Sequence, residues 1–234
     1  ETIDGINQVV DHHNESGQIF IWQTDENWDF VKDFAYSNPD FESYYQIEKD
    51  FNIDLNNDDT IGLKLTANES FGEDYLLGDR FGGFHVKDES GVTHDIKRYG
   101  EKVNSNWSRE WELIAAETID GINQVVDHHN ESGQVYIWQT DENWDFVSNL
   151  AYSNPDFESY YQIEKEFNVD LNNDDIIGLK LTANESFGED YLLGDRFGGF
   201  HVKDESGVTH DIKRNGKKVN SNWSREWELI AAET

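Results

Sequence analysis

The sequence contains a unit of 116 residues that occurs twice in succession, at 1–116 and 117–232. Residues 1–10 return unchanged as 117–126, and 111–116 return as 227–232. Aligned over the repeat, the two copies differ at ten positions, and changes such as Ile19 to Val135 are mild. Such a period is the signature of a repeat architecture. We therefore predict two tandem copies of one module, residues 1–116 and 117–234.

The structural units need not begin where the copies begin. The stretch 66–70, Thr-Ala-Asn-Glu-Ser, is the most linker-like part of the repeat. Units that start there would comprise an intact unit at 67–182 and a second unit split between 183–234 and 1–66. The two chain ends would then close the split unit within one molecule, which we expect, or join neighbouring molecules end to end.

Charge and composition limit the possible partners. The formal charge is −31, aromatic residues make up 14% of the chain, and cysteine is absent. The aromatic content argues against disorder, and the negative charge against binding to nucleic acid or anionic membranes. No apolar run approaches the roughly 18 residues of a membrane span, so we expect no membrane insertion. A chain this acidic favours cations as partners.

Each copy reads as a mainly β, α+β module of antiparallel strands with one helix. The segment 18–23 is apolar on both faces, which predicts a central strand buried on each side. The residues 37–40, Ser-Asn-Pro-Asp, are typical of a helix start, and the apolar spacing then runs to an end near Asn52. Further strands are predicted at 6–11, 28–31, 71–77, 81–87, 92–97 and 111–116.

An acidic loop follows the predicted helix. Asp54, Asn56 and Asp58 have the Asp-x-Asn-x-Asp spacing of the first half of an EF-hand loop, and Thr60 would add its backbone carbonyl. Hard oxygen ligands at this spacing suit calcium. Two positions depart from the pattern, with Asp59 in place of glycine and Leu65 in place of a bidentate glutamate. The alternative is a plain turn rich in Asp and Asn. The second copy offers the counterparts Asp170, Asn172, Asp174 and Ile176.

A second Asp-x-Asn-x-Asp stands at 25–29, between two predicted strands. Asp and Asn are ordinary residues of hairpin turns. We interpret this segment as a turn, with a metal site as the weaker alternative.

The run from Trp138 through Asp141 and Asn143 to the helix, and on to the loop at 170–178, resembles the tryptophan-rich repeat domain of cyanobacterial secreted proteins. The resemblance covers most of the period and is strongest around the helix and loop. It implies a large, repetitive protein that is secreted or displayed on the cell surface. It implies no reaction.

Tryptophan, histidine and carboxylate side chains outside the acidic loop are further candidates for binding or catalysis. Exposed tryptophans could stack on sugar rings, and the candidates are Trp28, Trp107 and the second-copy residues Trp144 and Trp223. Strand parity predicts a half-buried His94 and an exposed His85. Paired carboxylates, as in glycoside hydrolases, are expected by chance in so acidic a chain, so they are weak evidence for catalysis.

The sequence therefore predicts a non-enzymatic, calcium-binding structural or adhesive repeat of a secreted or cell-surface protein. Near-identical adjacent copies suit a binding or spacer module, which gains avidity or reach from repetition. Its expected partners are calcium ions, with polysaccharide or neighbouring repeats as further possibilities. A glycan-binding module is the second hypothesis, and a carboxylate-dependent glycoside hydrolase the third.

Overall fold

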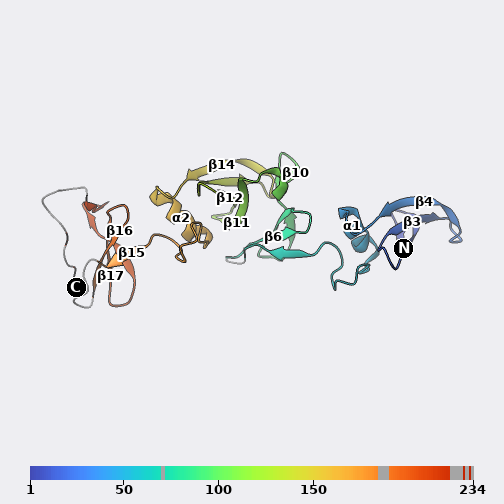
Figure 1. The fold of residues 1–234 in the computed structure, drawn as a ribbon, viewed down its shortest axis with the longest axis horizontal. Helices are drawn as coiled ribbons and strands as arrows, with labels where there is room; N and C mark the ends of the chain where they lie inside the picture. The colour runs from blue at the N-terminus through green and yellow to red at the C-terminus, as the bar shows by residue number, and fades with distance from the viewer. Residues whose placement is uncertain (70–71, 184–189, 222–228, 230–231, 233–234) are drawn as a thin grey trace. The chain divides into compact units, whose positions relative to one another are not determined.

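The computed structural model describes residues 1–69, 72–183, 190–221, 229 and 232. It confirms the predicted class, a β-rich α+β module of antiparallel sheets with one α-helix in each copy (Figure 1). The chain forms two compact units. The first comprises residues 1–70, 75–109 and 143–146, and the second comprises residues 71–74, 110–142 and 147–234.

The first copy opens with a four-stranded antiparallel meander in the order β1-β2-β3-β4. Its strands are β1 (Thr2–Ile3), β2 (Ile6–His12), β3 (Ile19–Thr24) and β4 (Phe30–Ser37). Helix α1 (Glu42–Phe51) follows. The predicted strand at 6–11 and the strand within 18–23 are confirmed.

Helix α1 ends where the sequence predicts and begins later. Its C-cap, Asn52, has the left-handed conformation, with φ of 51°. At the other end Asn38 Oδ1 accepts the backbone N–H of Asp40 at 2.8 Å, so these residues form a separate Asx turn. The N-cap is Phe41, which has no side-chain cap. The predicted start at 37–40 is therefore the turn that leads into the helix.

The first core lies between the helix and one face of the meander. Its buried members are Ile19, Ile21, Tyr44, Tyr45, Ile47 and Leu55. The opposite face of β3 is open, because Phe20 between the two isoleucines is 42% exposed. The prediction that this strand is buried on both sides is wrong for the first copy.

The second half of the repeat is a smaller four-stranded sheet followed by a two-stranded hairpin. The sheet contains β5 (Leu65–Ala67), β6 (Tyr75–Asp79), β7 (Phe84–Lys87) and β8 (Thr93–Asp95), in that order. The hairpin contains β9 (Lys97–Arg98) and β10 (Glu101–Lys102), and the 3-10 turn η1 (Ser105–Trp107) follows. Leu76, Val86 and Ile96 are fully buried in this half.

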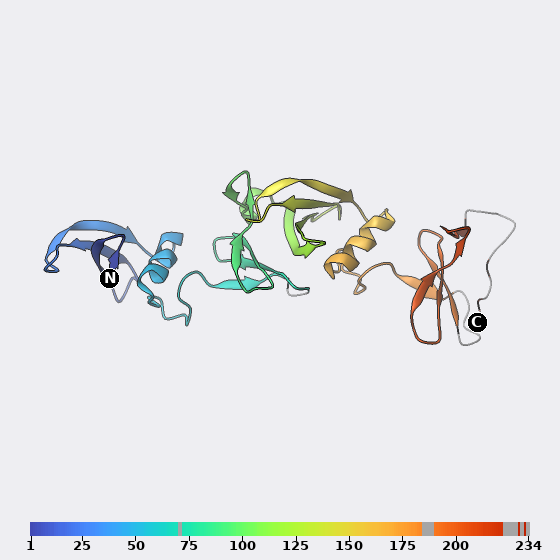
Figure 2. The same cartoon turned by 180° about the vertical axis from the view of Figure 1, so that it is seen from behind.

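The second copy repeats this order. It contains β11 (Trp111–Ile119), β12 (Ile122–His129), β13 (Val135–Thr140), β14 (Phe146–Ser153), α2 (Glu158–Phe167), β15 (Leu181–Ala183), β16 (Tyr191–Asp195), β17 (Phe200–Lys203), β18 (Thr209–Asp211), β19 (Lys213–Arg214) and β20 (Lys217–Lys218). Its first strand pairs along the whole of β12, whereas β1 pairs only with Ile6 and Asn7 of β2. Helices α1 and α2 each pack on the meander of their own copy (Figure 2).

Candidate functional site

The acidic loop after each helix turns its side-chain oxygens inward. The backbone N–H of Asp58 lies 3.2 Å from Asp54 Oδ1 and 2.8 Å from Asn56 Oδ1. The second copy repeats this, with the N–H of Asp174 at 3.2 and 2.9 Å from its two acceptors. Two of the predicted ligand oxygens therefore converge on one nitrogen in both copies.

The backbone of the loop accommodates an aspartate at its sixth position, where an EF-hand loop has glycine. Asp59 has φ of 64°, in the left-handed region where an EF-hand loop places glycine, and its counterpart Asp175 has the same value. Aspartate adopts this region more readily than most residues. The N–H of Asp59 is held by Asp54 Oδ2 at 3.0 Å. The N–H of Thr60 is held by Asp58 Oδ1 at 3.0 Å, which completes the turn.

A buried glutamate of the helix holds the two ends of the loop together. Glu48 is fully buried, and its carboxylate accepts the N–H of Leu55 and of Gly62, both at 3.0 Å. Burial raises the pKa of this carboxyl, and it raises the pKa of its counterpart Glu164 to about 7. Sequence reasoning missed this residue, although a charged side chain flanked by the apolar helix face was a usable signal.

The loop offers a limited set of metal ligands. Across the part of the chain that the structure describes, no three His, Cys, Asp or Glu side chains group together to hold an ion. The predicted ligand positions bring two carboxylates, one amide and the backbone carbonyl of Thr60. Leu65, at the position of the bidentate glutamate, begins strand β5 and supplies no side-chain oxygen.

A buried tyrosine lies close to this loop in each copy. Tyr44 is fully buried and its hydroxyl has no hydrogen-bond partner among the described residues. Burial, together with the charges of Glu48, Asp54 and Asp58, raises its pKa to about 12. Tyr160 repeats the arrangement, and its pKa is raised by burial and by Glu164.

Basic side chains approach the same loop. In the second copy Asn172 and Asp174 line a cavity of about 440 Å³ together with Lys180 and Arg196. These two cations offset part of the negative charge that the loop carries.

The tryptophans predicted as sugar platforms do not share one environment. Trp28 and Trp107 are exposed over 52% and 51% of their surface. Trp144 is only 2% exposed, so its prediction as a sugar platform is wrong. The backbone N–H of Lys97, in strand β9, donates to the Trp144 carbonyl at 3.0 Å. Trp223 lies outside the described residues.

The polar turn at 25–29 is an Asx turn. Asp25 Oδ1 accepts the backbone N–H of Asn27 at 2.8 Å and that of Asp29 at 3.0 Å. These bonds set the turn between β3 and β4 that carries Trp28.

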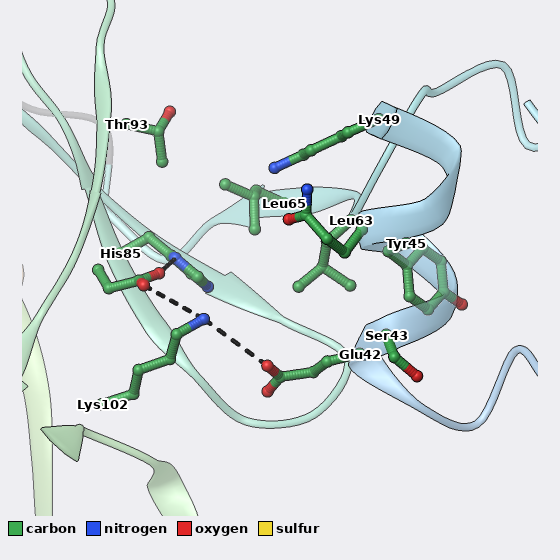
Figure 3. Close-up of a pocket in the computed structure, with 11 residues that line it drawn as sticks. Glu42, Ser43, Tyr45, Lys49, Leu63, Leu65, His85, Thr93 and Lys102 are labelled. Atoms are coloured by element: carbon green, nitrogen blue, oxygen red, sulfur yellow. Dashed lines mark ion pairs between the residues drawn. The ribbon is translucent and has the colours of Figure 1, made fainter. Parts of the chain in front are cut away.

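A polar cavity separates helix α1 from strands β7 and β8, and sequence reasoning missed it. Its volume is about 630 Å³, and Figure 3 shows Glu42, Lys49, His85 and Lys102 around it. His85 is only 5% exposed, so the prediction of an exposed histidine is wrong. The side chains of Asp79 and Asp95 flank its ring, and helix α1 lines the same cavity. A matching cavity of about 490 Å³ lies beside α2.

Each ring nitrogen of His85 faces a carboxylate. Nε2 lies 2.8 Å from Asp79 Oδ2, and Nδ1 lies 2.9 Å from Asp95 Oδ1. Both nitrogens can donate together only when the ring carries two protons. Gly83 lacks a side chain where a Cβ would come within 2.5 Å of Asp79 Oδ2. The His201 ring repeats both contacts in the second copy, at 2.8 and 3.1 Å.

A lysine extends this network to the helix. Lys102 Nζ lies 3.2 Å from Asp95 and 3.7 Å from Glu42 (Figure 3). Burial alone would lower the pKa of this lysine, but the hydrogen bond and charge of Asp95 outweigh it and raise the pKa. The counterpart Lys218 contacts Glu158 and Asp211. The network joins helix and small sheet within one unit, which is a structural task.

Two near-identical copies of a sheet, a helix and an acidic loop define a tandem-repeat module. The family model of the tryptophan-rich Synechocystis species C-terminal domain matches residues 1–62 and 75–178, and the chain belongs to this family. The second match runs across the boundary between the two copies. No curated protein shows significant similarity to the chain. None of the described helices is long and apolar enough to cross a membrane.

Proposed function

We propose that the chain is a calcium-binding structural repeat of a secreted or cell-surface protein. The observation that carries the proposal is the convergence of Asp54 Oδ1 and Asn56 Oδ1 on the N–H of Asp58, repeated in the second copy. Side-chain oxygens gathered in this way form the first half of an oxygen cage for a hard cation. The ligand set would be Asp54, Asn56, Asp58 and the Thr60 carbonyl, with Asp170, Asn172, Asp174 and the Ile176 carbonyl in the second copy.

The role of the ion would be mechanical. The loop connects helix α1 to strand β5, and Glu48 already holds its two ends. A bound cation would fix the remaining freedom of this corner and offset part of the net charge of −31. We assign no reaction to the chain.

Affinity should be low. The missing bidentate glutamate and the nearby basic side chains both reduce the gain from a divalent cation. We expect dissociation constants of about 10⁻⁴ to 10⁻³ M, the range of extracellular calcium modules.

Thermal unfolding in chelator and across a calcium titration tests the proposal. Calcium at a hundredfold over its dissociation constant should stabilise the fold by about 2.7 kcal/mol for one site. The double variant Asp54→Ala/Asp170→Ala should abolish the rise in midpoint. The matched control Asp25→Ala/Asp141→Ala changes the same residue type in the hairpin turns and should leave the rise intact. A flat response of the unmodified protein would refute the proposal.

Glycan binding is the second candidate, because Trp28 and Trp107 keep about half of their surface exposed. Exposed tryptophan faces can stack on sugar rings. A glycan array in the presence and absence of chelator separates the two functions, since a structural repeat should retain no glycan. Loss of a signal in Trp107→Ala, with Trp144 buried and unable to contribute, would favour the second candidate.

A further inference from the structure

The cavity beside the second acidic loop gathers two basic side chains. Its volume is about 440 Å³, and it is lined by Asn172 and Asp174 of the loop together with Lys180 and Arg196. The chain has only 18 basic residues against 49 acidic ones, so two cations on one cavity are unusual for it. All residues that line the cavity belong to the second compact unit.

The guanidinium of Arg196 is held in place from helix α2. It lies 5.8 Å from the ring centroid of Tyr161 and 5.5 Å from that of Phe197, and it donates to the Tyr161 hydroxyl at 2.5 Å. Its carboxylate partner Asp156 lies at 3.8 Å and is 87% exposed, so this ion pair is weak. The Arg196 side chain keeps 53% of its own surface exposed. A fixed, half-exposed guanidinium is well suited to binding a carboxylate with two hydrogen bonds.

The other charged groups at the cavity differ in how far they are already paired. Lys180 is exposed and forms no ion pair with any residue that the structure describes. Asp195 lines the cavity too, but one of its oxygens lies 2.8 Å from His201 Nε2, and the other accepts the N–H groups of Phe197 and Gly199. Outside the acidic loop, the charges that remain for a ligand are therefore the positive ones.

Two features weaken calcium binding by the loop alone, and an anionic ligand would reverse both. The loop lacks the bidentate glutamate of an EF-hand, so an ion held there keeps coordination positions for other oxygens. The neighbouring cations repel a divalent ion. An oxygen of an anionic ligand would fill an open position, and its charge would offset the two cations. The ion and the anion would therefore favour the binding of each other.

We propose that this cavity binds a carboxylate of an acidic polysaccharide together with a calcium ion at the loop. The inference rests on the calcium site proposed above. The carboxylate would contact both the ion and the Arg196 guanidinium, while Lys180 adds positive charge. A chain with a net charge of −31 repels polyanions at long range, so this binding should require calcium.

A sugar fits the rest of the cavity better than an acidic peptide does. Pro155 offers an apolar surface to a sugar ring, and Thr182 offers a hydroxyl to its hydroxyl groups. A carboxylate fixed on a ring loses less conformational entropy on binding than one on a flexible Asp or Glu side chain. A polyuronate also repeats its carboxylate at every sugar, so tandem copies of the module gain avidity for it.

The first copy presents the same basic groups. Arg80 donates to the Tyr45 hydroxyl at 2.6 Å and lies 5.5 Å from the Phe81 ring centroid, as Arg196 does with its own partners. Lys64 directly precedes strand β5, as Lys180 directly precedes β15. Each copy therefore supplies one arginine and one lysine beside its acidic loop.

Calorimetry on the full chain tests the coupling in both directions. Calcium is titrated with and without trigalacturonate, and trigalacturonate with and without calcium. By linkage, each ligand should tighten the binding of the other by the same factor, which we expect to be roughly tenfold. The methyl ester of the same trisaccharide lacks the charge and should leave the calcium affinity unchanged. Calcium titrated into trigalacturonate alone is the blank for direct complex formation.

The possible results separate the shared site from the calcium proposal. Calcium binding that trigalacturonate leaves unchanged would overturn the shared site, while the calcium proposal would stand. Trigalacturonate that binds equally well in chelator would overturn the role of the ion. Equal tightening by a triglutamate peptide would overturn the choice of a sugar. Calcium titrations without heat in both conditions would end both proposals.

A pair of lysine variants gives effects of opposite sign. Lys64→Gln/Lys180→Gln removes positive charge from both cavities, so calcium alone should bind slightly more tightly and the coupling to trigalacturonate should fall. The matched control Lys87→Gln/Lys203→Gln changes exposed lysines of the small sheets and should keep the full coupling. Circular dichroism checks that both variants are folded. Full coupling in Lys64→Gln/Lys180→Gln would contradict the proposed site.

Discussion

Trp28 and Trp144 occupy equivalent positions in identical six-residue turns, yet one is half exposed and the other is core. Burial is therefore decided by the neighbour that covers a residue. The second turn contacts hairpin β9–β10, through the Lys97 N–H that donates to the Trp144 carbonyl and the Arg98 guanidinium that lies over Phe146. The two turns allow the effect of burial on one tryptophan to be measured within one protein.

The largest expected effect is the loss of the buried member of this pair. Trp144→Ala removes a fully packed indole and should lower the free energy of unfolding by about 3–5 kcal/mol. Trp28→Ala should change it by less than about 0.5 kcal/mol, because this indole is half exposed. Urea denaturation of both variants gives the difference. Equal losses would mean that the first turn is also covered.

The second prediction concerns the buried carboxylates under the two loops. The folded-state pKa of Glu164 is raised from 4.5 to about 7, so the folded state holds this proton more tightly than the unfolded state. Its stabilising effect is complete below pH 4.5 and is lost as pH rises through about 7. Urea denaturation in chelator should show a fall on the order of 1–3 kcal/mol over this window.

Replacing one buried glutamate at a time separates the contributions of the two copies to this pH dependence. Glu164→Gln should remove part of this slope, and Glu48→Gln should remove a smaller part. A slope also remains from Glu117, whose pKa burial raises to about 7. An unchanged slope in Glu164→Gln would contradict the assignment.

The third prediction exchanges the residues that distinguish the two hairpins. Tyr99 packs edge-on against Phe146 with 5.8 Å between centroids, and the second copy has Asn215 in its place. Tyr99→Asn should cost about 0.5–1.5 kcal/mol of stability because the aromatic pair is lost. Asn215→Tyr should change stability by less than about 0.5 kcal/mol, because no aromatic ring among the described residues packs against that position, and urea denaturation measures both variants. A loss in Asn215→Tyr as large as that in Tyr99→Asn would contradict this reading of the aromatic pair.

The smallest effect is expected within the acidic loops. The seventh loop position differs between the copies, with Thr60 in one and Ile176 in the other. An EF-hand loop uses only the backbone carbonyl there. Exchanging the two residues should therefore change stability by less than about 0.5 kcal/mol and leave any calcium response unaltered in calorimetry. A lost response would show that the hydroxyl of Thr60 takes part.

Local patterns predicted the longer strands and the helix end at Asn52, because each depends on residues close together in the chain, whereas the short strands β1, β5 and β10 were not predicted. The burial of His85 and Trp144 could not be predicted in this way. His85 lies between the carboxylates of Asp79 and Asp95, and Trp144 lies in a compact unit formed mainly by the preceding repeat. Glu48 was missed because its partners, the N–H groups of Leu55 and Gly62, face it only after the loop has folded back.

Hairpin β9–β10 precedes the turn that carries Trp144 in the chain. A ribosome completes the N-terminal part of a chain first. Hairpin β9–β10 therefore leaves the ribosome before the turn that carries Trp144, although both belong to one compact unit. That unit cannot be completed until residues 143–146 of the next copy have been synthesised, so successive repeats would fold in the direction of translation.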